Sequence, residues 1–552
     1  MRMGMLATAF ALMFAPSLAP AADPAVVYQT QPLGRLLDDV RAHVQSLGGE
    51  EAAKSFNKDI IKRSLGDKGF EGFDLNRPIV GYIEVPADPM DAVAVVCFPI
   101  TGEKEWLEFC ERWNKSKPKA LKDGIYEVPP PSPEFKAAMR IVEGYAYVAT
   151  GMKDPARALD AKAIVPFAKI YDGADVSLMA GRIYFDRVPK ELRTKAKQGL
   201  EQLKKLGDAG KNGEQLASFA KLLLGPALAM GSRYLDLSEG AKEATLRVNL
   251  DVISGDLAAE LTVTPVEGSP LDKVIFGMKP GTNRFAGIIG PDAAAGIKLR
   301  LPLDIPEVQA GAIAGLEALQ KEANNNAFPP MKGIVDELLK GLIRTVKTGE
   351  MDGAAVLRGP SKDGTFTASM GIAFDDPSGV EKELKKVIES IAPQDFKDHI
   401  KWDAEKANGV SIHTIDISKM PGGDREFKAL FGNNVMFAFA FGPKASYAAI
   451  GPGAEAVAAV KAAMAVKPVP APAIDFAYNA DKLLKLATTL EPQGAVMVEK
   501  IIGKQDKLIS ALSWTTTGGK ELKVKVGLNV RYFGSWLGVS RSAAFEPVPP
   551  AK

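Results

Sequence analysis

The feature that most constrains the fold is an order of elements that occurs twice along the chain of 552 residues. A helix-like segment opens with Glu103-Lys104-Glu105-Trp106, and another opens with Glu381-Lys382-Glu383-Leu384, at an offset of 278 residues (381 − 103). The same offset separates Gly240-Ala241-Lys242-Glu243 from Gly518-Gly519-Lys520-Glu521, and each of these turns stands between two strand-like runs. The pattern therefore predicts one module used twice.

The two predicted copies can be followed element by element. The first has strands at 78–85 and 92–98, a helix at 103–113, strands at 124–128, 144–150 and 176–184, and a closing hairpin at 234–237 and 244–252. The second has strands at 353–357 and 366–374, a helix at 380–391, strands at 409–415, 445–450 and 474–478, and a closing hairpin at 511–515 and 522–530. In the last strands Leu246, Val248 and Leu250 match Val524, Val526 and Leu528, alternating with polar residues as in a half-buried strand.

Many strands joined by short turns, with helices at irregular intervals, favour an α+β fold over a doubly wound parallel sheet. We predict a tandem duplication of a mainly antiparallel sheet module with helices packed on one face. The predicted modules are 23–270 and 283–544, with a Gly- and Pro-rich linker near 266–282 and a Pro-rich tail at 545–552. Each copy is expected to begin with a strand and helices, at 26–28 and 33–47, and at 285–289 and 307–323. The second copy carries an expected insertion around 395–434, and the first carries a longer late helical region, 188–228.

Residues 1–22 have the pattern of a signal peptide. Arg2 gives a short positive region, 5–14 is apolar but too short to span a bilayer, and small residues follow around Ala19 and Ala21. After this segment no run approaches the ~20 apolar residues of a transmembrane helix. The sequence thus predicts a protein exported to the periplasm or secreted, without a transmembrane segment after cleavage.

The composition is that of an ordinary globular protein, with 46% hydrophobic and 25% charged residues. The formal net charge is only +2, from 69 basic and 67 acidic residues. Nucleic-acid binders normally carry a basic stripe, so nucleic acid is not an expected partner.

The two cysteines allow two interpretations. Cys97 lies in a predicted strand, and Cys110 lies on the buried face of the next helix, which Trp106, Phe109 and Trp113 share at helical spacing. A disulfide between Cys97 and Cys110 suits an oxidising compartment. The alternative is two buried free thiols. In the predicted second copy Ile388 corresponds to Cys110 and an apolar residue of 372–373 corresponds to Cys97, which is compatible with either interpretation.

No catalytic, cofactor or metal site is predicted. The three histidines, His43, His399 and His413, lack metal-ligand spacing, and His399 is interpreted as a surface histidine in the insertion. The turn from Gly451 to Ala456 fits a loose dinucleotide fingerprint, but its counterpart at Gly151 keeps one glycine, so we interpret both as strand-to-helix connections.

Two further motifs have simpler interpretations than catalysis. Ser116 and Lys119 spell Ser-x-x-Lys without the companion motifs of a nucleophile site. The carboxylates of Asp375 and Asp376 precede a helix, where capping is expected.

Aromatic residues gather in the first copy. Trp106, Trp113, Tyr126 and Tyr147 predict a core, and as a sharper alternative they would line a site for an apolar or aromatic ligand. We therefore expect a non-enzymatic binding or scaffold protein of the cell envelope, with an apolar ligand, a lipid or an envelope protein as its partner. The alternative is a hydrolase whose site lies in a cleft between the two modules.

Overall fold

The computed structural model describes residues 23–55, 62, 65–130, 132–191, 194, 240–251, 256–326, 332–419, 425–479, 482 and 510–529. The chain divides into two compact units, Met1–Leu271 (unit 1) and Asp272–Lys552 (unit 2). The expected signal peptide, the strand 234–237, most of the region 188–228 and the tail 545–552 lie outside the described residues.

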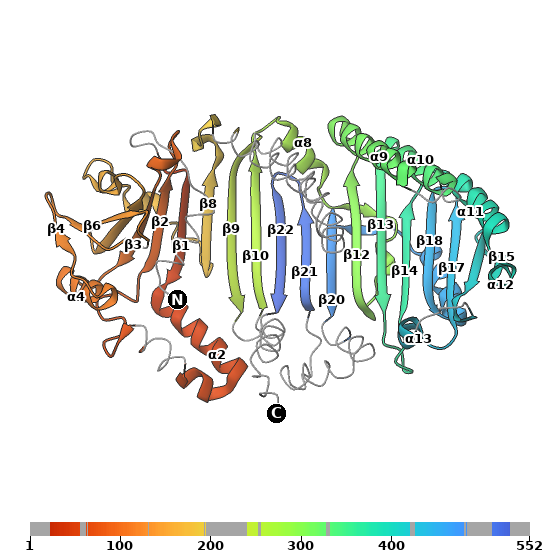
Figure 1. The fold of residues 1–552 in the computed structure, drawn as a ribbon, viewed down its shortest axis with the longest axis horizontal. Coiled ribbons are helices and arrows are strands. Elements are labelled where there is room, and N and C mark those ends of the chain that lie inside the picture. The colour runs from red at the N-terminus through yellow and green to blue at the C-terminus, as the bar shows by residue number, and fades with distance from the viewer. Residues whose placement is uncertain are drawn as a thin grey trace, which may run out of the picture. The chain divides into compact units, whose positions relative to one another are not determined.

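Unit 1 is built around antiparallel strands that follow one another in the order β10–β9–β8–β1–β2–β3–β7–β6–β5–β4 (Figure 1). Their bounds are β1 Val26–Pro32, β2 Pro78–Glu84, β3 Val93–Pro99, β4 Lys119–Ala120, β5 Ile125–Glu127, β6 Lys136–Val142, β7 Tyr145–Gly151, β8 Met179–Tyr184, β9 Ala241–Asp251 and β10 Asp256–Pro265. The helical elements are α2 Leu33–Ser55, η2 Pro89–Asp91, α4 Glu103–Asn114, η3 Pro155–Leu159, α5 Phe167–Ile170 and η4 Phe185–Arg187.

Unit 2 has antiparallel strands in the order β22–β21–β20–β12–β13–β14–β18–β17–β16–β15, and a separate pair, β11 with β19 (Figure 1). The strand bounds are β11 Gly281–Asn283, β12 Ala293–Pro302, β13 Glu350–Arg358, β14 Thr367–Ala373, β15 Ile400–Ala407, β16 Val410–Asp416, β17 Val435–Gly442, β18 Ala445–Pro452, β19 Val469–Ala471, β20 Ile474–Asn479, β21 Ser510–Thr517 and β22 Leu522–Asn529. The helical elements are α8 Pro270–Gly277, η5 Ala286–Ile288, α9 Pro306–Asn326, α10 Lys332–Lys347, α11 Ser378–Ile391, α12 Gln394–Lys397, η7 Ile417–Lys419, α13 Arg425–Phe431 and α14 Gly453–Ala465.

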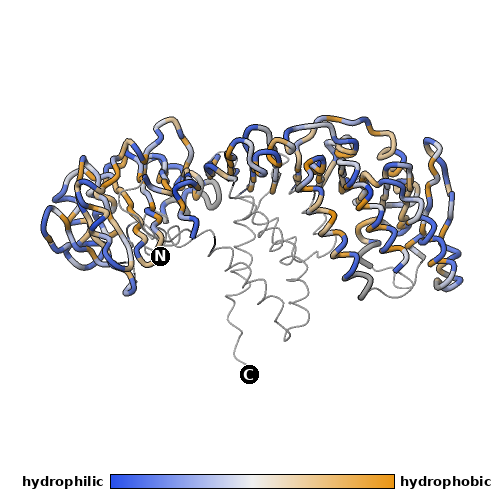
Figure 2. The backbone as a smooth tube through the Cα atoms, turned by 90° about the horizontal axis from the view of Figure 1, so that it is seen from above, coloured by the Kyte–Doolittle hydropathy of each residue, from blue (hydrophilic) through white to orange (hydrophobic). Residues whose placement is uncertain are grey.

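The α+β class and the antiparallel pairing are as the sequence predicts. Hydrophilic and hydrophobic residues are interspersed along the backbone (Figure 2). Three local expectations differ. The expected linker contains α8, which begins at Pro270, a residue favoured at the first helical position. The expected strand at 285–289 is the short helix η5. The strand at 244–252, expected to close the first module, is β9, and it forms a hairpin with a further strand, β10.

Helices cover both faces of the strands in unit 1, not one face as expected. Successive residues of a strand point to opposite faces. On β3, Phe98 stacks on Trp106 of α4 at 5.5 Å between ring centroids. Its neighbour Cys97 lies in a cluster with Leu159 of η3 and Ile170 of α5. Alternate apolar side chains of β3 therefore pack into two hydrophobic clusters, one on each side of the strands.

Unit 2 repeats this division between two faces. Ile412 of β16 packs with Ala456 and Val460 of α14, and we call this side of the strands face A. The next residue, His413, points to the opposite side, face B, where it lies beside Glu381 of α11. Different helices therefore lie on the two sides, with α14 packed on face A and α11 beside β16 on face B.

The disulfide alternative does not form in the structure, in which both cysteines are buried free thiols. Cys97 belongs to the cluster under η3 and α5, while Cys110 of α4 belongs to the cluster on the other side of the strands. Pairing them would require β3 to shift by one residue, which would reverse every side chain of the strand. Burial raises the pKa of the Cys110 thiol to about 12, so this group is not a reactive thiolate.

The strands β4 and β15 lie at the ends of their strand orders. β4 has two residues and pairs with β5. β15 pairs with β16 among the described strands, and it has a bulge around Asp403, whose φ is 51°. Its exposed residues include Lys401, Glu405 and Lys406. Short, bulged and charged edges disfavour the addition of another strand.

Candidate ligand-binding groove

The aromatic residues predicted to line a site do not lie together. Trp106 is 3% exposed between Phe98 and Phe109, and Trp113 packs at the margin of the same cluster. Tyr147 is equally buried but lies on the other side of the strands. The Tyr126 hydroxyl donates a hydrogen bond to Glu103, which raises the pKa of Tyr126. These side chains form core and surface contacts, and they do not share one cavity.

An apolar groove lies instead on face B of unit 2, and its volume is about 360 Å³. It is lined by residues of β12, β13, β14, β17, β18 and β20: Ala295, Gly296, Ile297, Ala355, Val356, Leu357, Ala368, Ser369, Met370, Phe437, Ala448, Ala449, Ile450 and Phe476. This volume falls within the range of about 300–1,000 Å³ that is usual for small-molecule sites. None of the lining residues is ionisable.

Cross-strand register explains why these residues meet. Ile297 pairs with Ala355, Ala355 with Met370, and Met370 with Ala448. A second row runs alongside, in which Leu357 pairs with Ala368 and Ala368 with Ile450. Both rows point to the same side because the residues of each row lie two positions from those of the other. The groove therefore runs across the strands.

Small side chains make this part of the face hollow. The alanines at the middle strands provide a low floor, whereas Phe476 on β20 and Phe437 on β17 stand at the two ends. Six strands at spacings of 4.7–4.9 Å give the groove a length of about 24 Å. Ile297 and Met370 remain 43% and 40% exposed, which is unusual for large apolar residues at the centre of a sheet.

A polar cluster adjoins the end of the groove at Phe437. The Phe437 ring stacks on Phe439 at 5.5 Å, and Phe439 lies 5.2 Å from the His413 ring. Trp402 packs edge-on against His413 at 5.1 Å. The aromatic row thus continues from the groove to a buried histidine.

His413 is held in a defined state by its neighbours. Its Nδ1 accepts a hydrogen bond from the backbone N–H of Asp403 at 3.0 Å, so the neutral ring carries its proton on Nε2. Nε2 lies 3.3 Å from Glu381 Oε1 but is not aligned for a hydrogen bond with any described residue. Lys385 donates to Glu381 at 2.7 Å. Burial lowers the pKa of His413, and the charge of Lys385 acts in the same direction, against the carboxylates of Glu381 and Asp403.

Sequence reasoning did not single out these positions. His413 belongs to no recognisable motif. Its burial follows only from its place opposite Phe439 in the pairing of β16 with β17, which puts both side chains on the same face. The groove had one visible signal, because 435–441 places phenylalanine at Phe437, Phe439 and Phe441 and small or apolar residues between them. Only the cross-strand register shows which face of the strands, and so which alternate residues, line the open groove.

The remaining sequence candidates occupy connections. His399 lies between α12 and β15, where its backbone oxygen accepts from Asp416, and His43 lies in α2. Asp376 accepts a hydrogen bond from Ser378 at the start of α11, which lowers the pKa of Asp376. Ser116 lies in the connection after α4, and Lys119 is the first residue of β4.

The glycine turn that opens α14 is a connection in this structure. Gly453 follows β18, which is antiparallel to both of its neighbours, β14 and β17. The dinucleotide fingerprint requires a parallel strand–helix–strand unit, which this segment does not form.

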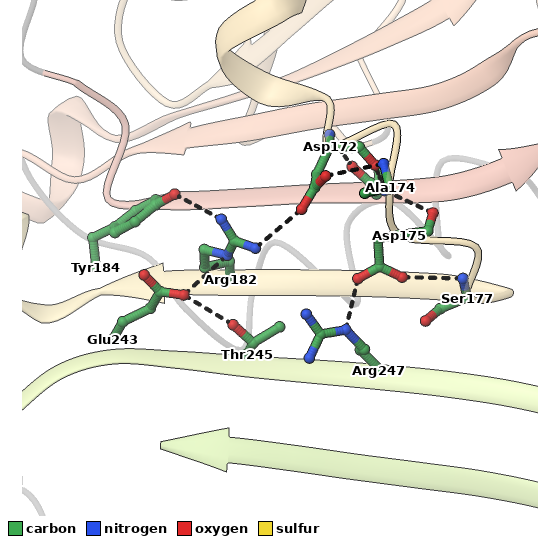
Figure 3. A network of polar contacts seen from close by, with 10 residues as sticks. Asp172, Ala174, Asp175, Ser177, Arg182, Tyr184, Glu243, Thr245 and Arg247 are labelled. Atoms are coloured by element: carbon green, nitrogen blue, oxygen red, sulfur yellow. Dashed lines mark hydrogen bonds and ion pairs between the residues drawn. The ribbon is translucent and has the colours of Figure 1, made fainter. Parts of the chain in front are cut away.

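Unit 1 contains a polar network over β8 and β9 (Figure 3). Arg182 lies between Asp172 and Glu243, at 3.4 and 3.0 Å. Arg247 pairs with Asp175 at 2.7 Å. Burial raises the pKa of Asp175, but hydrogen bonds from Ser177 and Arg247 outweigh this effect and hold the pKa below its usual value.

The network is better suited to holding a loop than to binding a ligand. Gln29 of β1 accepts from the N–H of Asp172 at 2.7 Å and donates to the Asp172 carbonyl at 2.9 Å. The charges of the network compensate one another, since Arg182 and Arg247 each have at least one carboxylate partner. A cavity of about 240 Å³ lies beside the network. The segment 172–177 is thereby fastened to the sheet.

Within the described ranges, no group of three or more His, Cys, Asp or Glu side chains is arranged to hold a metal ion. No helix in the described part of the chain is both long and apolar enough to cross a membrane. Comparison of the chain with protein-family models, curated proteins and solved structures gives no match.

Proposed function

We propose that this protein binds an elongated apolar ligand, such as the acyl chain of a lipid or fatty acid, in the groove of unit 2. The observation that carries the proposal is the open apolar groove itself, with a volume of about 360 Å³ and large exposed side chains at its centre. Its orientation across six strands suits a long, narrow ligand better than a compact one.

The lining favours binding over catalysis. General acid–base and nucleophilic chemistry need an ionisable or nucleophilic side chain within reach of the ligand. The groove offers apolar side chains apart from Ser369, which lies between Ala368 and Met370 and so points to the opposite side of β14. A non-enzymatic binding protein of the cell envelope, exported by its first 22 residues, is consistent with this lining.

We also propose that the two units are copies of one duplicated module. The strand order of unit 1 corresponds position by position to that of unit 2. In β3 and β7 Cys97 pairs with Tyr147, and in β14 and β18 Gly371 pairs with Tyr447. If the units are copies, the residue of unit 2 that corresponds to Cys97 is Gly371, and not a residue of 372–373.

A shared polar contact supports the same proposal. In unit 1 Glu103 of α4 accepts from Tyr126 of β5, and in unit 2 Glu381 of α11 faces His413 of β16. Both glutamates lie in the first turn of their helix, α4 after β3 in unit 1 and α11 after β14 in unit 2. An open groove is described in unit 2, so the ligand site is proposed for this unit alone.

The test of the groove is a titration with dansyl-labelled undecanoate, whose fluorescence rises in an apolar site. Ala368→Trp places a large ring in the floor, and we expect the affinity to fall about tenfold or more, because the ring occupies the space of the acyl chain. Leu319→Trp, on the exposed side of α9, is the matched control and should bind as the wild type does. Circular dichroism verifies that both variants are folded. Unchanged binding by folded Ala368→Trp would rule out the groove.

A further inference from the structure

A second cavity of unit 2, on face A, has a different chemical character. Its volume is about 420 Å³, and it lies between the C-terminal end of α14, the turn that joins β17 to β18, and the segment before η5. Tyr447 and Ala445 contribute to it from β18, whereas their neighbour Ala448 contributes to the groove on face B. The sheet therefore separates the two cavities.

One wall of this cavity is apolar. Phe285, Met464 and Val466 line it. The Phe285 ring is 2% exposed and packs edge-on against the Tyr447 ring, with 5.9 Å between their centroids. Because these rings are fixed by the core behind them, the wall is formed before any ligand arrives.

Hydrogen-bond donors and positive charge converge on the same cavity. Arg284, Lys444 and Tyr447 are among its lining residues. Burial raises the pKa of Tyr447, while the charge of Arg284 acts against this rise, so the hydroxyl remains a neutral donor near pH 7. Arg284 forms an ion pair with Asp352, at 3.9 Å.

The electrostatic balance of the lining is positive. No carboxylate is among the residues that line the cavity, and Asp352 is itself buried behind Arg284. The end of α14 contributes backbone carbonyls equivalent to about half a negative charge. Asp352 offsets the charge of Arg284. The full charge of the exposed Lys444 exceeds the contribution of the helix end, so the lining keeps a positive balance.

We propose that this cavity binds a small amphipathic anion, a carboxylate with an apolar body. The carboxylate is recognised by Lys444, Arg284 and the Tyr447 hydroxyl, and the apolar body lies against Phe285 and Met464. Charge-assisted hydrogen bonds are about twice as strong as neutral ones, so the charge of the head group decides the selectivity. This site is distinct from the groove and does not depend on the proposed function.

The test uses the full chain, with decanoate and the uncharged decanol as probes in calorimetric titrations. We expect decanoate to bind at least about tenfold more tightly than decanol. Lys444→Gln and Tyr447→Phe should each weaken decanoate binding by about tenfold and leave decanol binding unchanged. Lys428→Gln, at an exposed lysine that does not line the cavity, is the control and should bind decanoate as the wild type does.

The groove variant separates this proposal from the first. Ala368→Trp should retain decanoate binding at the cavity even when it no longer binds dansyl-labelled undecanoate. Equal affinity for decanoate and decanol would overturn the proposal. So would decanoate binding that is lost in Ala368→Trp but kept in Lys444→Gln, because the anion would then lie in the groove.

Discussion

At the scale of single residues, His413 shows how position decides chemistry. Its ring is 1% exposed, its Nδ1 accepts from the backbone of Asp403, and Trp402 and Phe439 enclose it. A second proton would have to enter at Nδ1, directly opposite the N–H of Asp403. The folded protein therefore favours the neutral ring, in agreement with the lowered pKa of this histidine.

We predict that His413 makes the stability of the protein depend on pH on the acid side of neutrality. In the unfolded chain a histidine takes up its proton near pH 6.5. The folded protein takes it up at lower pH, so the stability of the wild type falls as the pH drops below about 6.5, by at most about 1.4 kcal/mol per pH unit. In His413→Phe this contribution disappears, and the stability advantage of the wild type over the variant should shrink on acidification from about pH 7.5 to pH 5.

Urea unfolding at the two pH values measures this difference. His399→Gln, at the half-buried histidine before β15, is the control and should keep the pH dependence of the wild type. A wild-type advantage that grows toward pH 5 would contradict the predicted direction.

Sequence alone could predict individual residues only where local chemistry fixes them. At the start of η3 the Asp154 carboxylate accepts the N–H of Ala156 at 3.2 Å, and an aspartate followed by Pro155 is a local signal of such a cap. The face taken by Cys97 and the burial of His413 depend on strands that are distant in sequence. No local pattern contains that information.

At the scale of elements, the contact between β1 and β2 depends on a glycine. Tyr28 pairs with Gly81, and the tyrosine ring lies over the glycine so closely that a Cβ at Gly81 would be 2.3 Å from the ring. The Tyr28 hydroxyl extends across β2 toward the carbonyl of Val95, at 3.5 Å. The ring thus fills the place of the missing side chain and ties three strands together.

We predict that Gly81→Ala lowers the free energy of unfolding by about 1–3 kcal/mol, because the added methyl group displaces the Tyr28 ring or the strand. Gly315→Ala in α9 is the matched control, since a Cβ there meets nothing within 4 Å. In a helix this change should raise the stability by up to about 1 kcal/mol. Urea unfolding measures both free energies. An unchanged free energy of unfolding in Gly81→Ala would contradict the prediction, because the close contact of Tyr28 with Gly81 would then not contribute to stability.

Most elements were predictable because alternation and helical spacing are local signals. The predicted helix at 103–113 is α4, Glu103–Asn114, and the predicted strand at 78–85 is β2, Pro78–Glu84. The linker was the clearest miss, since Pro270 and the glycines around it can open and close a short helix as well as a loop. The pairing of β9 with β8 could not be deduced, because it depends on long-range register.

At the scale of the whole molecule, each unit contains its own hydrophobic clusters. Leu159 of η3 is fully buried in a cluster of unit 1, and Ile412 of β16 is fully buried in a cluster of unit 2. No hydrophobic cluster described for one unit includes a residue of the other. The units thus have the internal cores that independent folding requires.

We predict that the two units unfold as separate cooperative steps in calorimetry. Leu159→Ala and Ile412→Ala each remove a buried aliphatic side chain, a change that costs about 2–5 kcal/mol. Each variant should lower the Tm of one transition and leave the other unchanged, and the two variants should affect different transitions. A single transition that both variants lower equally would show that the units unfold together.

The ends of the strand orders, at β4 and β15, have a consequence for the behaviour of the protein at high concentration. A run of many antiparallel strands is the kind of surface on which a foreign strand can dock and start a fibril. At β4 two residues offer too few backbone groups for such docking, and at β15 the left-handed turn at Asp403 interrupts them. Both β4 in unit 1 and β15 in unit 2 are therefore poor templates for a strand from another molecule, and we expect neither edge to start growth from one molecule to the next.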